Sequence, residues 1–105
     1  MTYKLVITEY ADELLDHILY YIFFQLKNEL AVKHLLNGIE NVYSRLEENP
    51  LQFPISKDTL LAQKGYHEAV VPHMNYIIIY DIQGNTVNVV GIFHQSENYQ
   101  NNYLK

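Results

Sequence analysis

The 105-residue chain is 49% hydrophobic, which is enough to bury the core of one domain and argues against a disordered protein. Twelve acidic residues against seven basic ones give a net charge of −5, with a single arginine, so the chain lacks the basic patch of a stand-alone nucleic-acid-binding domain. The absence of cysteine excludes disulfides and cysteine-based zinc sites.

The N-terminus lacks the features of a secretory signal, which are a charged start, an apolar run and a small-residue cleavage site. The longest apolar run, residues 18–24, is far shorter than the ~18 residues that a membrane-spanning helix needs. We therefore expect a cytoplasmic protein with one domain over residues 1–105.

Residues 3–8, YKLVIT, alternate in the manner of a β-strand, with Tyr3, Leu5 and Ile7 on one face. Thr8 has the side chain of a helix N-cap, and we expect a helix over residues 9–27. Its core stripe recurs at helical spacing: Ala11, Leu14, Leu15, Ile18, Ile22 and Leu26.

Four further apolar residues, Leu19, Tyr20, Phe23 and Phe24, widen this stripe beyond one helix face. A solvent-facing helix would carry charges at these positions. Two explanations are open: either the sheet and the next helix bury this helix from both sides, or a protein partner covers its second face. These four residues are the candidate partner-binding surface.

A second helix is expected over Glu29–Glu48, because Asn28 can cap its start and Asn49-Pro50 ends it. Its apolar stripe is Ala31, Leu35, Ile39, Val42 and Leu46. The short connection predicts an antiparallel hairpin with the first helix. Gly38 is unfavourable inside a helix and indicates close packing of the two helices.

The connection over residues 51–64 is long for a compact domain, and it contains Pro54. Loops of this length are either functional or held in place by their own side chains. The side chains expected to hold it are Leu51, Phe53, Ile55, Leu60 and Leu61.

Three strands are expected after Gly65. Residues 76–80, YIIIY, form an unbroken β-branched and aromatic run, which predicts a strand covered on both faces. Residues 83–85 supply a hairpin turn before the last strand, residues 86–94. The order β-α-α-β-β-β predicts a two-layer α+β fold in which a helical hairpin packs on one face of a mostly antiparallel four-stranded sheet. The opposite face would be free for a partner or a site.

These elements carry short motifs in a fixed order. The motifs are the strand YKLVIT, Ala11 with Asp12-x-Leu14 in the first helix, Asn49-Pro50 after the second, Gly65-Tyr66-His67, residues 76–80, and the final Ile92-Phe93-His94-Gln95. Together they resemble the RelE/ParE superfamily of toxins from type II toxin–antitoxin modules, of the plasmid-stabilisation type. The resemblance implies that the first strand lies beside the last one, and that a small antitoxin protein binds tightly.

Within that superfamily, RelE-like members cut messenger RNA on the ribosome, using basic residues and a C-terminal tyrosine. ParE-like members lack this set and poison DNA gyrase. The present chain has His67 where the family often has arginine, and Ile77 where nuclease relatives tend to carry a base. The resemblance therefore favours ParE-like target binding, with a ribosome-dependent mRNA endoribonuclease and a catalytically inactive interaction module as alternatives.

If the chain is a nuclease, its candidate catalytic residues are His94, Tyr99 and His67. His94 would act as general base on a ribose 2′-hydroxyl, Tyr99 would orient the substrate, and protonated His67 would contact phosphate. The competing interpretation of His94 is a strand-end histidine that hydrogen-bonds to the backbone.

His67 and His73 share a face if the second strand is regular, and together with His94 they could form a metal site, but no metal-binding motif accompanies them. We therefore expect no metal and no cofactor. His17 and His34 lie on the two predicted helices, and we expect structural roles for both. The sequence leaves open whether the chain forms a homo-oligomer.

Overall fold

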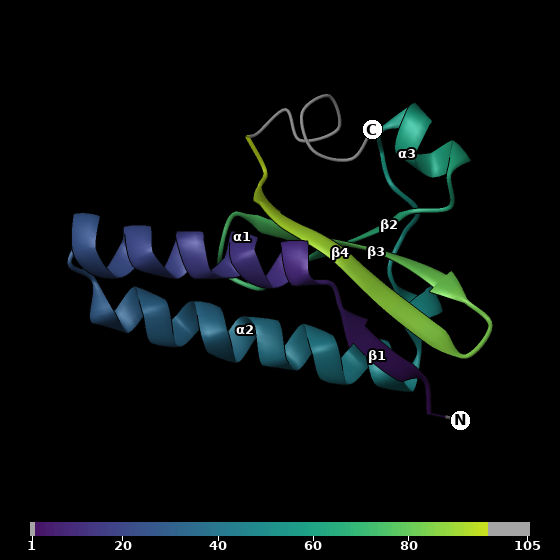
Figure 1. Ribbon diagram of the computed structural model, residues 1–105, viewed down its shortest axis with the longest axis horizontal. Coiled ribbons are helices and arrows are strands. Elements are labelled where there is room, and N and C mark those ends of the chain that lie inside the picture. The colour runs from purple at the N-terminus through teal and green to yellow at the C-terminus, as the bar shows by residue number, and fades with distance from the viewer. Residues whose placement is uncertain (1, 97–105) are drawn as a thin grey trace.

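The computed structural model describes residues 2–96, which form one sheet, a hairpin of two long helices and three short helical turns (Figure 1). In chain order the elements are β1 (Lys4–Ile7), α1 (Glu9–Tyr20), the π-helical turn η1 (Tyr21–Gln25), α2 (Glu29–Glu48), the 3-10 turn η2 (Pro50–Gln52), α3 (Thr59–Gln63), β2 (His67–Val70), β3 (Tyr76–Gln83) and β4 (Thr86–His94). The predicted α+β class and element order are confirmed.

The four strands lie in the order β1-β4-β3-β2. β1 pairs in parallel with β4, from Lys4 opposite Thr86 to Ile7 opposite Val89. The other two pairs, β4 with β3 and β3 with β2, are antiparallel. The sheet is thus mostly antiparallel, and the first and last strands lie side by side, as the family resemblance implied.

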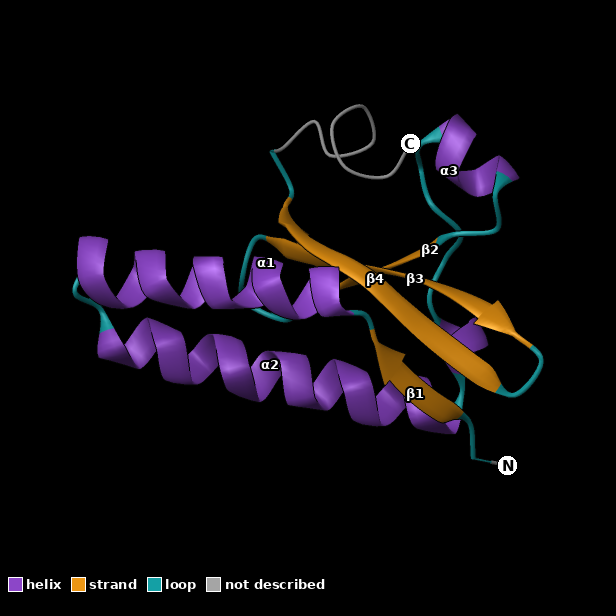
Figure 2. Cartoon of the chain, viewed as in Figure 1, coloured by secondary structure: helices purple, strands orange, loops and turns teal. Residues whose placement is uncertain are grey.

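The two long helices begin at the predicted caps. The Thr8 hydroxyl accepts a hydrogen bond from the Ala11 N–H at 3.1 Å, and the Asn28 side chain accepts one from the Ala31 N–H at 3.0 Å. The helices run antiparallel and extend beyond the strands at the end where they connect (Figure 2). The predicted pairing of two helices in a hairpin is confirmed.

The first helix differs from the prediction near its end. The predicted helix over residues 9–27 is an α-helix only to Tyr20, and η1 continues it as a wider π-turn in which the Leu26 N–H bonds the Tyr21 carbonyl five residues back. Lys27 then adopts φ +51°, a left-handed conformation that turns the chain into α2.

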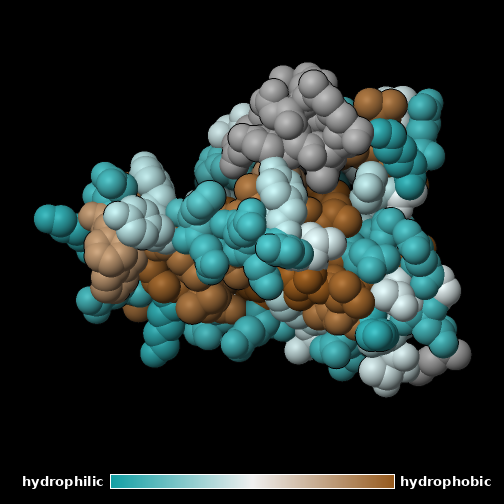
Figure 3. Space-filling model, in the orientation of Figure 1, coloured by the Kyte–Doolittle hydropathy of each residue, from teal (hydrophilic) through white to brown (hydrophobic). Residues whose placement is uncertain are grey.

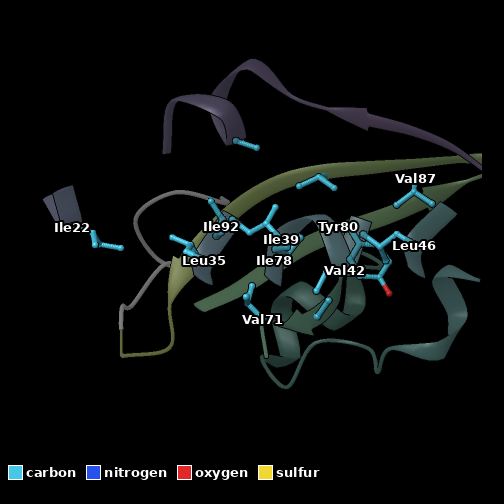
Figure 4. Close-up of a cluster of buried hydrophobic side chains, with 13 residues drawn as sticks. Ile22, Leu35, Ile39, Val42, Leu46, Val71, Ile78, Tyr80, Val87 and Ile92 are labelled. Carbon is cyan, nitrogen blue, oxygen red and sulfur yellow. The ribbon is translucent and has the colours of Figure 1, made fainter. Parts of the chain in front are cut away.

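The main core lies between α2 and the sheet. Leu35, Ile39, Val42 and Leu46 of α2 are buried against Ile78, Tyr80, Val87 and Ile92 of the strands (Figure 4). Gly38 marks a close approach, but the prediction that a helix packs there is wrong, because its neighbour is the chain after β2. A Cβ on Gly38 would lie 2.6 Å from Cγ1 of Val71, so only glycine lets this segment contact α2 so closely.

The opposite face of the sheet is covered in part, which corrects the expectation of a free face. Leu61 is fully buried there against Ile77, Ile79 and Phe93. It comes from α3, a short helix within the predicted long connection, whose first turn is capped by the Asp58 side chain. Of the five side chains expected to hold the connection, Leu61 is buried and Phe53 is half-buried, whereas Leu51, Ile55 and Leu60 are exposed.

The same connection pins the outer edge of β2. The Ser56 N–H bonds the Tyr66 carbonyl, and the Glu68 N–H bonds the Pro54 carbonyl. The buried Glu68 carboxylate accepts hydrogen bonds from the Ser56 hydroxyl at 2.9 Å and from the Lys57 N–H at 2.7 Å. The edge strand is therefore partly protected from pairing with another chain.

Two tyrosines make folding sensitive to alkaline pH. Burial, with a smaller effect of Asp12, raises the pKa of Tyr43 to about 12. Burial also raises the pKa of Tyr80, whose hydroxyl donates to the Pro50 carbonyl at 2.5 Å, well above its usual range. In the unfolded chain both ionise near pH ~10. Stability from these groups is therefore present below pH ~10 and is lost as the pH rises further.

We expect the free energy of unfolding, measured by urea titration, to fall steadily between about pH 10 and pH 12. Tyr43→Phe removes one of the two groups and should flatten this dependence. Tyr20→Phe, a change at an exposed tyrosine, is the matched control and should leave it as it is. If Tyr43→Phe left the slope of the unfolding free energy against pH unchanged, the attribution of this pH dependence to Tyr43 would be contradicted.

Candidate functional site

The connecting end of the helical hairpin carries a cluster of exposed apolar side chains, which we call the aromatic tip. Its members are Tyr20, Tyr21, Phe23, Phe24, Leu26 and Leu30. Tyr20 is 60% exposed and Phe24 is 54% exposed. Figure 3 shows a tan, moderately hydrophobic patch among pale and teal residues at the left end of the molecule, where Figure 1 places this end of the hairpin.

The rings of the aromatic tip pack on one another. The ring centroids of Tyr20 and Phe24 are 4.6 Å apart, and those of Phe23 and Phe24 are 4.8 Å apart in an edge-to-face arrangement. Large exposed aromatics held together on a rigid element are typical of protein-binding surfaces. The tip is therefore the strongest candidate for a docking surface among the described residues.

The four residues predicted as the partner-binding surface are divided between the two explanations. Leu19 is half-buried against the core, as expected of a helix buried by its neighbours. Tyr20, Phe23 and Phe24 are exposed, as a partner surface requires. The sequence analysis placed Leu26 in the core stripe, which is wrong because Leu26 is exposed, and it did not include Tyr21 or Leu30 in the partner surface. Apolar periodicity does not show where the hairpin leaves the sheet.

His94 lies in a second candidate region, a groove between α1 and the end of β4. The groove encloses about 310 Å³ and is lined by Leu14, His17, Ile18, Tyr21, Tyr76, Ile92 and His94. The His94 ring meets the Tyr76 ring edge-to-face at 5.4 Å. None of the described residues that line the groove is lysine or arginine. An anionic transition state there would lack the positive charge that stabilises it.

The hydrogen bonds of His94 also fix its tautomer. The Ser96 N–H donates to Nδ1 of His94 at 3.1 Å, and the Ser96 hydroxyl lies 2.7 Å from the same nitrogen. Because Nδ1 accepts, the neutral ring carries its proton on Nε2. A general base needs an unprotonated nitrogen facing its substrate, and in this arrangement the unprotonated nitrogen is already engaged.

His67 is held in a different place and by other contacts. Its Nδ1 lies 3.1 Å from the Phe53 carbonyl, and its ring stacks on Tyr80 with centroids 5.2 Å apart. His67 pairs with Tyr80 and His94 pairs with Tyr76, on opposite sides of β3. Four residues at ~3.3 Å and two strand spacings of ~4.8 Å place the two histidines roughly 16 Å apart. They cannot act on one reacting atom.

Comparison with known proteins identifies the family. Residues 5–99 match the ParE toxin of the type II toxin–antitoxin system parDE. The chain belongs to the ParE toxin family. It is accordingly the toxin component of a type II toxin–antitoxin system, and the resemblance found in the sequence is confirmed. No curated protein matches the sequence significantly.

Two solved structures share the ParE fold of this chain. One is a chromosomal ParDE toxin–antitoxin system from P. aeruginosa, with a TM-score of 0.64 and 16% identity over 89% of this chain and 96% of that one. The other is the RelBE2 toxin–antitoxin complex from Mycobacterium tuberculosis, with a TM-score of 0.61 and 20% identity over 92% of this chain and 95% of that one. At these identities the likeness concerns the fold.

Two further residues of this ParE family member bear on a nuclease activity: the candidate Tyr99 and the single arginine, Arg45. Tyr99 lies outside the described residues. Arg45 is engaged in structure, because its Nε donates to Gln52 at 2.8 Å and its guanidinium lies 4.8 Å above the Phe53 ring.

Within residues 2–96, no three His, Cys, Asp or Glu side chains come together as a metal cluster, so His67, His73 and His94 do not form one. No helix among those residues is long and apolar enough to cross a membrane.

Proposed function

We propose that this toxin arrests growth by binding a protein target, in the manner of ParE-like members that poison DNA gyrase, and that it acts in the cytoplasm. The observation that carries the proposal is that no lysine or arginine is among the described residues that line the His94 groove. A ribonuclease would have to stabilise a pentacovalent phosphate there without a cationic side chain. Binding a protein surface makes no such demand.

The histidines support the same choice. The candidate catalytic residue His67 does not join His94 in the groove, since it lies on the far side of β3 and stacks on Tyr80. The acceptor nitrogen of His94 is turned toward Ser96. The net charge of −5 opposes contact with RNA phosphates, so any ribosome-dependent activity would rely on the ribosome for its electrostatics.

The antitoxin partner is proposed to cover the aromatic tip. Tyr20 and Phe24 are large, exposed and fixed by their mutual contact, which lowers the entropy lost when a partner orders them. A partner with basic side chains around an apolar segment would complement the acidic toxin. The antitoxin would thereby remove from water the apolar surface that the free toxin exposes.

Expression without the antitoxin tests the proposal. We expect wild type, His94→Ala and Tyr99→Phe to arrest growth about equally, with DNA damage and with intact transcripts. Transcript mapping and a DNA-damage reporter are the two measurements, and both are compared at equal amounts of soluble toxin.

Two other outcomes would assign the alternatives. Cleavage of transcripts that His94→Ala abolishes would establish the ribosome-dependent endoribonuclease in place of the gyrase-type toxin. A folded, soluble protein that leaves growth unaffected would identify an inactive interaction module. Growth arrest with neither DNA damage nor transcript cleavage would contradict both named targets.

A further inference from the structure

A second hollow lies between α2 and the turn that follows β2. It encloses about 440 Å³ and is lined by His34, Asn37, Gly38, Asn41, Pro72 and His73. His34, Asn37, Gly38 and Asn41 share one face of α2, because they are spaced three or four residues apart. None of the lining residues carries a fixed charge.

The turn that brings His73 to this hollow has an unusual residue at its third position. The Met74 N–H bonds the Val71 carbonyl at 3.3 Å, Pro72 occupies the second position, and His73 adopts φ +63°. This is the pattern of a type II turn, whose third position is normally glycine or asparagine. Histidine there costs conformational energy that glycine would avoid, so the side chain of His73 is a candidate for a functional role.

The packing around Gly38 brings the turn that carries His73 against the helix that carries His34. A Cβ on Gly38 would lie 2.6 Å from Val71 and 3.8 Å from the Pro72 carbonyl oxygen, so the turn crosses α2 at this residue. His34 precedes Gly38 by about 6 Å along the helix axis. His73 follows Pro72 directly, with a Cα spacing of about 3.8 Å. Both residues therefore border the same hollow, His34 from α2 and His73 from the turn.

The side chains of His34 and His73 differ from those of His67 and His94, which are engaged in hydrogen bonds. His67 bonds a backbone carbonyl and His94 bonds Ser96. The imidazole side chains of His34 and His73 make no hydrogen bond to any other of residues 2–96. Two unengaged imidazoles beside the amide oxygens of Asn37 and Asn41 form a nitrogen and oxygen donor set.

We propose that this hollow binds one divalent transition-metal ion of the zinc, nickel or copper type, held by the imidazoles of His34 and His73. Imidazole suits these ions, an amide oxygen or water completes the coordination, and the acidic chain attracts cations. No sequence motif indicates the site, because its two histidines lie on different elements and come together only when the turn packs on Gly38. The site is independent of the proposed target of the toxin.

Isothermal titration of the untagged protein with zinc chloride and with nickel chloride tests the site. We expect one ion per chain, and an affinity that falls at least tenfold in His34→Gln and at least tenfold in His73→Gly. The double variant should be no more than a fewfold weaker than either single variant, because one lost imidazole already removes the chelate. His73→Gly should raise the thermal midpoint of the metal-free protein, which separates loss of metal from loss of fold.

The matched control is His17→Gln, which removes an imidazole from the groove at His94 and should leave metal affinity unchanged. The proposal is overturned if neither ion binds, or if the two key variants bind as tightly as wild type. It is also overturned if His17→Gln weakens binding as much as His34→Gln does, because the ion would then occupy the other groove.

Discussion

Replacing Tyr20 and Phe24 together by alanine is expected to weaken binding of the cognate antitoxin by about 100-fold or more. Truncating an aromatic anchor at the centre of an interface commonly costs at least ~2 kcal/mol, and ~1.4 kcal/mol corresponds to a tenfold change in affinity. The two rings touch each other at 4.6 Å, so they form one surface that both substitutions remove. Calorimetric titration of the purified toxin with the protein encoded by the neighbouring gene gives the affinity.

The folded state should survive these changes, because both side chains are mostly exposed and substitutions at such positions usually alter stability by less than about 0.5 kcal/mol. Leu51→Ala is the matched control, since Leu51 is 66% exposed and lies beyond the other end of α2. Unchanged affinity in the double variant, or an equal loss in Leu51→Ala, would place the antitoxin on another surface.

The sequence predicted those parts of the fold that depend on local chemistry. Thr8 and Asn28 cap helices wherever the chain places them, and the helical spacing of Leu35, Ile39 and Val42 requires one buried face. The toxin family followed from motifs spread over almost the whole chain. These signals need no knowledge of which distant residues meet.

The remaining features depend on long-range contacts. The separation of His67 from His94 follows from strand register, which a one-residue slip would alter, and the sequence does not specify it. Leu61 lies in a helix of only five residues, too short for an apolar pattern to reveal, and tertiary packing buries it. The exposure of Phe24 likewise depends on the hairpin being longer than the strands.

Phe93→Ala is expected to lower the free energy of unfolding by about 3–5 kcal/mol, as in other fully buried phenylalanine positions. Phe93 is completely buried with Leu61, Ile77 and Ile79 on the sheet face that α3 helps to cover. A domain of this size has only about 5–15 kcal/mol of stability in total, so the variant should be close to unfolding at 37 °C. Urea denaturation followed by circular dichroism measures the loss.

The matched control is Val70→Ala on β2, where the side chain is half exposed and the expected loss is below about 1 kcal/mol. A similarly small loss for Phe93→Ala would mean that this face of the sheet is not a packed core layer. That outcome would support the open sheet face that was predicted from the sequence.

Gly91 connects this loss to the position of the Phe93 ring. A Cβ on Gly91 would lie 2.4 Å from the edge of that ring, so Gly91→Ala should cost about 1–3 kcal/mol by overpacking. In a Phe93→Leu background the obstructing ring is absent, and adding Gly91→Ala should cost distinctly less. The two substitutions are therefore expected to be non-additive by at least ~0.5 kcal/mol, as for residues in direct contact. Strict additivity would show that the ring does not lie over Gly91, and that the burial of Phe93 has another cause.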